Sequence, residues 1–340
     1  MGLDFGEQFD ATFENALAAA GYGKFHYILV IFGGLLYAYA AISITVLSFV
    51  LPSAQCDFGM TSSDKGWLNA APMLGMVFGS YFWGCLADTQ GRKITLIGAL
   101  LVDGLCGIAS SVAQYYGVFL ALRFINGFFY LIWISRFFPN SYYTLMLWFP
   151  ELFNRYEKFE HLHPGKVASV CDVSALQPAD NSTVATCSGE VNPEVFSHTL
   201  IIGLACIPSS LAMPLLVHKM GAKWFLVAGL VLSSGVAMAL YYVQTSTQNL
   251  ILSCIFEALT GCCISVVYCI MVDLFPTNLR VLAAALSSTF GRFGGLTGNL
   301  MFGFLIDGHC LILICTLAAM LLIAGVFSMF LPATGKKELD

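Results

Sequence analysis

Some ionisable side chains, among them Glu257, Asp103 and Arg123, lie inside long apolar stretches of this 340-residue chain. Glu257 lies near the middle of the stretch 248–272, whereas Asp103 and Arg123 lie in two consecutive apolar stretches. Charged groups are costly in apolar surroundings, so those that occur there are candidates for a function. Glu257 has no basic residue on its own stretch, so it could bind a proton or the cationic group of a small organic ligand. Asp103 and Arg123 could act in the same way, or could form a structural ion pair with each other.

A second group of chemically informative residues lies in a short connection between two apolar stretches. Residues 84–93 read Gly-Cys-Leu-Ala-Asp-Thr-Gln-Gly-Arg-Lys. The glycines permit a tight turn, and the charges would lie at the end of one helix and the start of the next. Those charges could close one side of a helical bundle by pairing with neighbouring helix ends, or could simply mark a cytosolic loop. The candidate gating residues are Gly84, Asp88, Gly91, Arg92 and Lys93.

The composition restricts the class of protein that can carry these residues. Hydrophobic residues make up 58% of the chain and charged residues only 10%, whereas soluble domains carry about 25% charge. The apolar runs recur in lengths near 20 residues, which is the length that spans a bilayer. We therefore predict an all-α, polytopic helical membrane protein, with the lipid bilayer as its surroundings. The net charge of −5 argues against a nucleic-acid partner, and we find no catalytic set, phosphate loop or metal cluster that would predict an enzyme, a cofactor or a metal.

The apolar pattern predicts about nine full-length helices and one short one. The full-length helices are expected at roughly 27–50, 67–86, 94–114, 117–135, 198–217, 223–243, 248–272, 282–305 and 309–331. The corresponding organisation is a cytosolic lead-in (1–26), an N-terminal half with helices 1 to 4 (27–136), a short partial helix (137–153), a lumenal loop (154–197), a C-terminal half (198–331) and a cytosolic tail (332–340).

The loop 154–197 carries signs of an extracellular or lumenal location. Asn181 begins an Asn-Ser-Thr sequence, which is an acceptor for N-glycosylation. Cys171 and Cys187 could form a disulfide there in an oxidising compartment. Basic residues place the connections near Arg92, Lys219 and Arg280 in the cytosol.

The direction of the helices then requires one more membrane crossing between 136 and 154. Only the 17 residues 137–153 are available, and at 1.5 Å per residue they give roughly 25 Å, short of a bilayer core of about 30 Å. Either a short, strained helix crosses there, or the bundle is incomplete.

Three of these motifs resemble the major facilitator superfamily. The connection 84–93 resembles that family's loop after helix 2, and Arg123-Phe124-Ile125-Asn126-Gly127 resembles a motif of its helix 4. Residues 273–280, with Asp273, Pro276 and Arg280, resemble the cytosolic loop after its helix 10. More narrowly, segments 13–25, 48–54 and 147–153 resemble the synaptic vesicle glycoprotein 2 family and its relatives.

The resemblance implies a twelve-helix fold in which this chain lacks helices 5 and 6. Residues 1–129 would correspond to helices 1 to 4, and 140–331 to the end of helix 7 through helix 12. It also implies that the 84–93 connection closes the cytosolic side. A faint internal repeat supports two related halves, since 84–102 can be aligned with 214–232 so that Gly91 matches Gly221.

Two functions follow from the resemblance. The first is transport of a small organic solute by alternating access, impaired by the missing helices. The second is a non-transporting glycoprotein of the vesicle or cell surface, or a truncated isoform or gene model. Either protein would be a multi-pass protein of the plasma membrane or of a secretory or synaptic vesicle membrane.

Overall fold

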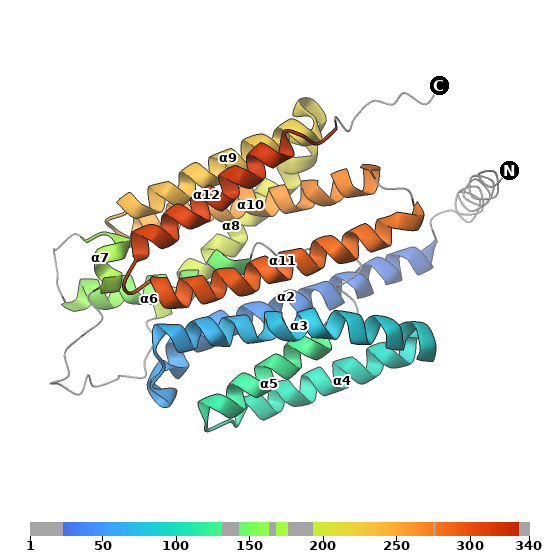
Figure 1. Cartoon of the computed structure of the whole chain (residues 1–340), viewed down its shortest axis with the longest axis horizontal. Coiled ribbons are helices and arrows are strands. Elements are labelled where there is room, and N and C mark those ends of the chain that lie inside the picture. The colour runs from blue at the N-terminus through green and yellow to red at the C-terminus, as the bar shows by residue number, and fades with distance from the viewer. Residues whose placement is uncertain (1–22, 131–142, 163–167, 176–192, 275–276, 333–340) are drawn as a thin grey trace. The chain divides into compact units, whose positions relative to one another are not determined.

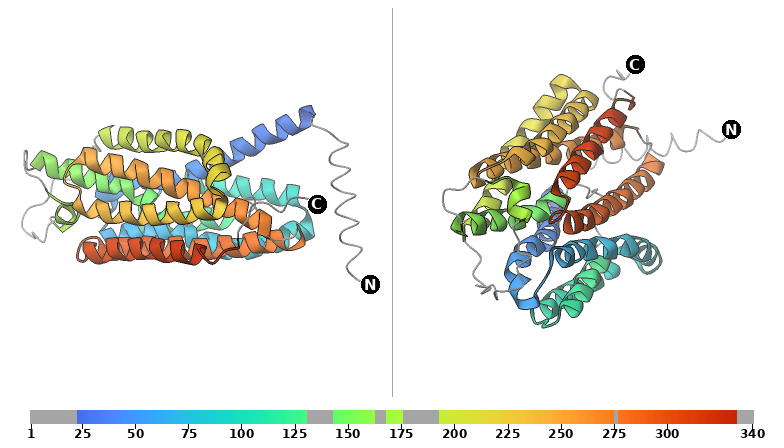
Figure 2. Two further views of the ribbon diagram at one scale, coloured as in Figure 1. Left: turned by 90° about the horizontal axis from the view of Figure 1, so that it is seen from above. Right: turned by 60° about the vertical axis from the view of Figure 1, so that its left-hand side comes forward.

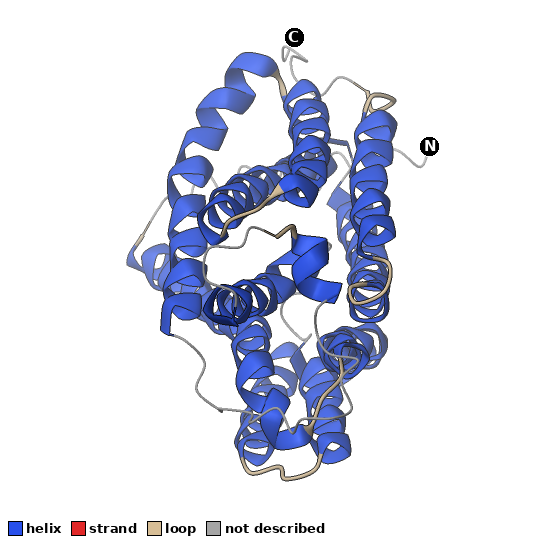
Figure 3. Ribbon diagram, turned by 90° about the vertical axis from the view of Figure 1, so that its left-hand side faces the viewer, coloured by secondary structure: helices blue, strands red, loops and turns tan. Residues whose placement is uncertain are grey.

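The computed structural model describes residues 23–130, 143–162, 168–175, 193–274 and 277–332 (Figure 1). Within these residues every regular element is a helix (Figure 3), as the composition predicts. Five described helices are long and apolar enough to cross a membrane, which fits the polytopic class. The helices are α2 (Lys24–Phe58), α3 (Ser62–Gln90), α4 (Arg92–Ser111), α5 (Tyr116–Phe129), α6 (Tyr143–Leu162), α7 (Val170–Ala175), α8 (Pro193–Met220), α9 (Ala222–Ala239), α10 (Ser246–Leu274), α11 (Thr277–Leu305) and α12 (Cys310–Ser328), with a 3₁₀ turn at Leu240–Tyr242.

Contacts divide the chain into two compact units, residues 1–44 and residues 45–340. The helix α2 begins in the first unit and ends in the second. All contacts given below lie within residues 45–340.

Two glycines join consecutive helices at equivalent places. Gly91, between α3 and α4, has φ +94°, and Gly221, between α8 and α9, has φ +82°. Residues with a Cβ rarely adopt such positive φ values, so glycine is needed at both joints. The two glycines are the pair that the sequence alignment of 84–102 with 214–232 matches, which supports the internal repeat.

Glycines also allow α3 to approach two neighbouring helices closely. A Cβ added to Gly127 of α5 would lie 2.0 Å from the carbonyl oxygen of Pro72 in α3. A Cβ added to Gly303 of α11 would lie 2.7 Å from the Cα of Gly66 in α3. Small residues at such contacts let helix backbones meet, as is common in membrane bundles. Figure 1 shows α3 beside both α5 and α11.

The later helices share an aromatic-rich core with α6. Trp148 stacks on Phe302 of α11 with ring centroids 4.7 Å apart, and Phe149 meets Phe256 of α10 edge to face. Around this core, α9 packs against both α10 and α12, and α8 packs against α10 (Figure 2).

The sequence prediction for α6 is wrong at the C-terminal end, whereas residues 137–142, where the helix was expected to begin, lie outside the described residues. The short helix was expected at 137–153 with a loop from 154, but α6 runs from Tyr143 to Leu162. Its 20 residues span about 30 Å at 1.5 Å per residue, but its polar second half keeps it out of the five helices that are apolar enough to cross a membrane. The helix continues past residue 153 because Asn154, Arg155, Tyr156 and Glu157 are buried against neighbouring segments rather than exposed in a loop.

Candidate functional site

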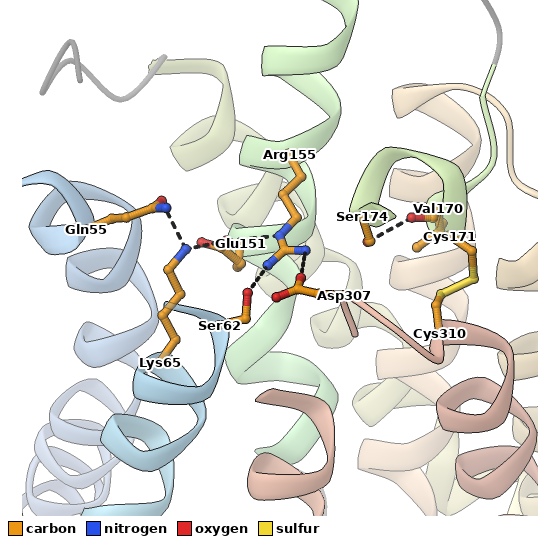
Figure 4. Close-up of polar contacts among 10 residues, drawn as sticks. All are labelled: Gln55, Ser62, Lys65, Glu151, Arg155, Val170, Cys171, Ser174, Asp307 and Cys310. Carbon is orange, nitrogen blue, oxygen red and sulfur yellow. Dashed lines mark hydrogen bonds and ion pairs between the residues drawn. A yellow bond between two sulfur atoms is a disulfide. The ribbon is translucent and has the colours of Figure 1, made fainter. Parts of the chain in front are cut away.

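Four charged side chains meet where the first turn of α3, the helix α6 and the α11–α12 turn come together (Figure 4). Lys65 of α3 donates to Oε1 of Glu151 in α6, and both side chains are only 1% exposed. Arg155, one turn further along α6, donates from Nε to the same oxygen at 3.1 Å. Its Nη1 reaches Oδ1 of Asp307 at 2.9 Å. We call Lys65, Glu151, Arg155 and Asp307 the charge network.

Two neutral residues complete the hydrogen bonds of the charge network. The Nζ of Lys65 donates to Oε1 of Gln55 at 3.0 Å, and Nη2 of Arg155 donates to the hydroxyl of Ser62 at 2.8 Å. Lys65 lies in the first turn of α3, before the apolar stretch. Burial lowers the pKa of its ammonium group, and the negative charge of Glu151 opposes that shift. The two cations thus share one carboxylate in a buried setting, while Asp307 is 46% exposed.

The sequence analysis missed the charge network. Each member lies at a helix end or in a stretch that was expected to be a loop, where charges need no explanation. Its clearest signal was the pair Glu151 and Arg155, since residues four apart lie on one face of a helix. That signal becomes visible only once residues 151–155 are recognised as helical.

A disulfide lies at the same end of the bundle, which we call the disulfide end. It joins Cys171 of α7 to Cys310, the first residue of α12, with Cα atoms 5.4 Å apart. The predicted pairing of Cys171 with Cys187 is therefore wrong. Both cysteines were assigned to one loop, but α7 brings Cys171 against α12. Cys187 itself lies outside the described residues.

The three ionisable residues singled out in the apolar stretches have different surroundings. Glu257, on α10, is 1% exposed, and neither of its carboxyl oxygens has a hydrogen-bond partner in the described part of the chain. Asp103 accepts a hydrogen bond at Oδ1 from Nδ2 of Asn126 at 2.7 Å. The guanidinium of Arg123 lies 5.0 Å from the ring centroid of Phe119 and interacts with Asp103 only at longer range.

A further buried cation, Arg292, was not singled out from the sequence. It lies near the middle of α11 and is 1% exposed. Its Nε, Nη1 and Nη2 atoms donate no hydrogen bond within the described residues. The rule that drew attention to Glu257, an ionisable residue inside an apolar run, applies equally to Arg292.

For the remaining predicted site residues that are described, the structure gives the helix or joint to which each belongs. Gly84 and Asp88 lie in the last turns of α3, Gly91 forms the joint, and Arg92 and Lys93 begin α4. Asp273 and Arg280 belong to α10 and α11. Pro276 and Asn181 lie outside the described residues. No group of residues suited to a metal ion occurs in the part that the structure describes.

Comparison with known proteins agrees with this arrangement. Residues 33–155 match the family model of the Major Facilitator Superfamily. A solved D-xylose-proton symporter superposes with a TM-score of 0.59 over 88% of this chain and 96% of that chain, at 15% identity, which shows a shared fold. The chain is thus similar in sequence to the Major Facilitator Superfamily over residues 33–155, and it shares its helical fold with this symporter.

Curated proteins to which this chain is similar include synaptic vesicle glycoproteins 2. Mouse synaptic vesicle glycoprotein 2C is 35% identical over 156 residues, which is 46% of this chain and 20% of the relative. Human synaptic vesicle glycoprotein 2B is 36% identical over 160 residues, which is 47% of this chain and 22% of the relative. The match thus spans about a fifth of each relative's length. The chain resembles the synaptic vesicle glycoprotein 2 family, as the sequence motifs predict.

The charge network links two groups of helices. Gln55, Ser62 and Lys65 belong to α2 and α3, whereas Glu151, Arg155 and Asp307 belong to α6 and the α11–α12 turn. The connection lies at the disulfide end, about 40 Å along α3 from Gly91 at 1.5 Å per residue. Glu257 and Arg292 lie in the middle of their helices, between the two ends of the bundle.

Proposed function

We propose that this chain carries a small organic solute across a membrane by alternating access, and that Glu257 binds either a proton or a cationic group of the solute. The observation that carries the proposal is the position of Glu257. Its carboxyl group is buried at the middle of α10 without a described partner. An ionisable group in that position is costly to keep, so a protein that retains it uses it.

The charge network supports the alternating-access part of the proposal. A transporter must close one side of its central site while the other side is open, and closure needs contacts between the two groups of helices. Lys65 and Arg155 provide such contacts at the disulfide end. We propose that the 84–93 connection, with Asp88 and Arg92, provides the matching closure at the opposite end.

The location that fits this function is a multi-pass membrane protein with its 154–197 loop on the lumenal or extracellular side. We propose the plasma membrane or a secretory or synaptic vesicle membrane. The synaptic vesicle glycoproteins 2 that the chain resembles favour the vesicle. Glycosylation of Asn181 and the Cys171–Cys310 disulfide would both fit the lumenal side.

A second function is favoured by the short connection between α5 and α6. Residues 130–142 lie between the described ends of these helices, whereas the resemblance implies two additional helices at this place. A chain without helices 5 and 6 lacks part of the wall of a central cavity, so the alternative is a membrane glycoprotein that does not transport.

Uptake by the purified full chain in proteoliposomes separates the two functions. Tetraethylammonium serves as a cationic probe and D-xylose as a neutral one, because the solved symporter of similar fold is named for xylose. We expect uptake of at least one probe, lost in Glu257→Gln, which keeps the size of the side chain and removes its charge. Glu160→Gln, at an exposed position of α6, is the matched control and should leave uptake unchanged.

Measurements at two pH values extend this test to the two roles of Glu257. A proton-binding Glu257 predicts that the pH dependence of uptake disappears in Glu257→Gln. Equal uptake per molecule and an unchanged pH profile in this variant would refute the role of Glu257. No uptake of any probe by the wild-type chain would favour the non-transporting glycoprotein.

A further inference from the structure

Arg292 is a buried cation for which the described part of the chain supplies no hydrogen-bond acceptor. The side chain is 1% exposed and is among the largest fully buried side chains. All three of its guanidinium nitrogens lack a hydrogen-bond acceptor among the described residues. A buried charge is normally paired or hydrogen-bonded because its desolvation is otherwise uncompensated.

The two other cations that are fully buried among the described residues, Lys65 and Arg155, are both paired. Arg155, which is equally inaccessible, donates to Glu151, Asp307 and Ser62. Lys65 donates to Glu151 and Gln55. This chain therefore pairs its buried cations when they serve to hold helices together, and Arg292 departs from that pattern.

The surroundings of Arg292 place it where the two groups of helices meet. The phenol groups of Tyr130, directly after α5, and Tyr268, on α10, interact electrostatically with its guanidinium. About two helical turns away along α11, Asn299 contacts Met73 of α3 through Nδ2 and Sδ at 3.6 Å. Arg292 thus lies near the end of α5 and beside α10, on a helix that packs against α3, and transporter sites form near the midplane between repeats.

We propose that Arg292 binds a carboxylate group of the transported solute. A guanidinium presents a planar fork of N–H donors that matches a carboxylate through two parallel hydrogen bonds. The phenol groups beside it are neutral and do not compensate its positive charge. An anionic group of the ligand would supply the negative charge and the hydrogen-bond acceptors that the described residues lack. This inference rests on the proposed function and specifies its solute class. Glu257 then takes either an ammonium group of the same solute or a coupled proton, and both fit a carboxylate at Arg292.

Binding to the full chain in detergent micelles tests the proposal without requiring transport. The probes are acetate, butyrate, benzoate and 4-aminobutyrate, each compared with its own amide, which has nearly the same shape but lacks the negative charge. Dissociation constants follow from the rise of the unfolding midpoint with probe concentration. We expect at least one acid to bind at least tenfold more tightly than its amide.

Variants assign that preference to Arg292. Arg292→Gln should reduce binding of the acid to the level of its amide, and Arg292→Lys should weaken it less because the charge remains. Lys219→Gln, which removes one positive charge at an exposed position of α8, should preserve the preference. If Arg292→Gln does not fold, Arg292→Lys is used instead. Lysine lacks the planar N–H donors of the guanidinium, so the affinity for the acid should still fall several-fold.

The proposal is overturned if no acid binds better than its amide, or if the preference survives unchanged in the Arg292 variants. The proposed function is decided separately by uptake into proteoliposomes. Uptake of a cationic or neutral probe without any acid preference would leave the transporter intact and refute the role of Arg292. If an acid binds more tightly than its amide, if this preference is lost in the Arg292 variants, and if the acid is not taken up, the binding site at Arg292 would be supported and transport of the acid refuted.

Discussion

Replacing Glu151 by glutamine should destabilise the protein strongly, because this one carboxylate serves two buried cations. Lys65 and the Nε of Arg155 both donate to its Oε1. Glutamine keeps the size of the side chain and one acceptor oxygen but removes the negative charge. The two cations then remain buried with only part of their partners.

The expected cost can be worked from those remaining partners. Removing one member of a buried ion pair typically costs about 3–5 kcal/mol. Arg155 keeps Asp307 and Ser62, and Lys65 keeps Gln55. We therefore expect the lower end of the range, about 3 kcal/mol. Further substitution of Lys65 by methionine should recover part of that loss, because the second buried charge is then removed as well.

Equilibrium unfolding in mixed micelles, followed by tryptophan fluorescence, measures these free energies, and Trp148 lies on the same helix as Glu151. The control is Glu160→Gln at an exposed position of α6, expected within about 0.5 kcal/mol of wild type. The reasoning is refuted if Glu151→Gln also unfolds within that range. It is equally refuted if the Lys65→Met and Glu151→Gln effects simply add, since residues in one network should show coupling.

Three further predictions follow from other parts of the molecule. Gly303→Ala should lower the free energy of unfolding by about 1–3 kcal/mol through overpacking against Gly66, whereas Gly294→Ala, with open space around its Cβ position, should not; equal effects would contradict the close contact. Asn181→Gln should abolish a glycosidase-sensitive gel shift if the loop is lumenal, and no shift in wild type from a glycosylation-competent cell would count against that side. Asp88→Ala should reduce uptake more than surface expression, and unchanged uptake at equal expression would leave the motif as a marker of topology.

Helical class and the glycine joints could be predicted from the sequence because they depend on local properties. Apolar runs of sufficient length specify helices in a membrane. Gly91 and Gly221 both have positive φ, a conformation that glycine adopts readily, so a single glycine in the sequence is enough to indicate each joint. Such features require no knowledge of which segments meet.

Features that depend on tertiary pairing were predicted poorly. The polar sequence after residue 153 indicated a loop, yet partners from α3 and the α11–α12 turn make Arg155 a buried helical residue. Arg123 was considered as a partner of Asp103, but the hydrogen bond to the Asp103 carboxylate comes from the neutral side chain of Asn126. The partner of Cys171 could not be deduced, since cysteine spacing alone does not determine connectivity. Arg292 was overlooked although, like Glu257, it is a single charge inside a long apolar run.

The Cys171–Cys310 disulfide has a consequence for the biogenesis of this protein. Its two cysteines are 139 residues apart in the chain. At a synthesis rate of about 5–20 residues per second, Cys171 is made roughly 7–28 seconds before Cys310. During that interval α8 to α11 are still being synthesised, and the Cys171 thiol is free to react with other thiols. Correct pairing therefore depends on an oxidising compartment that also allows mispaired cysteines to exchange until α12 has been inserted.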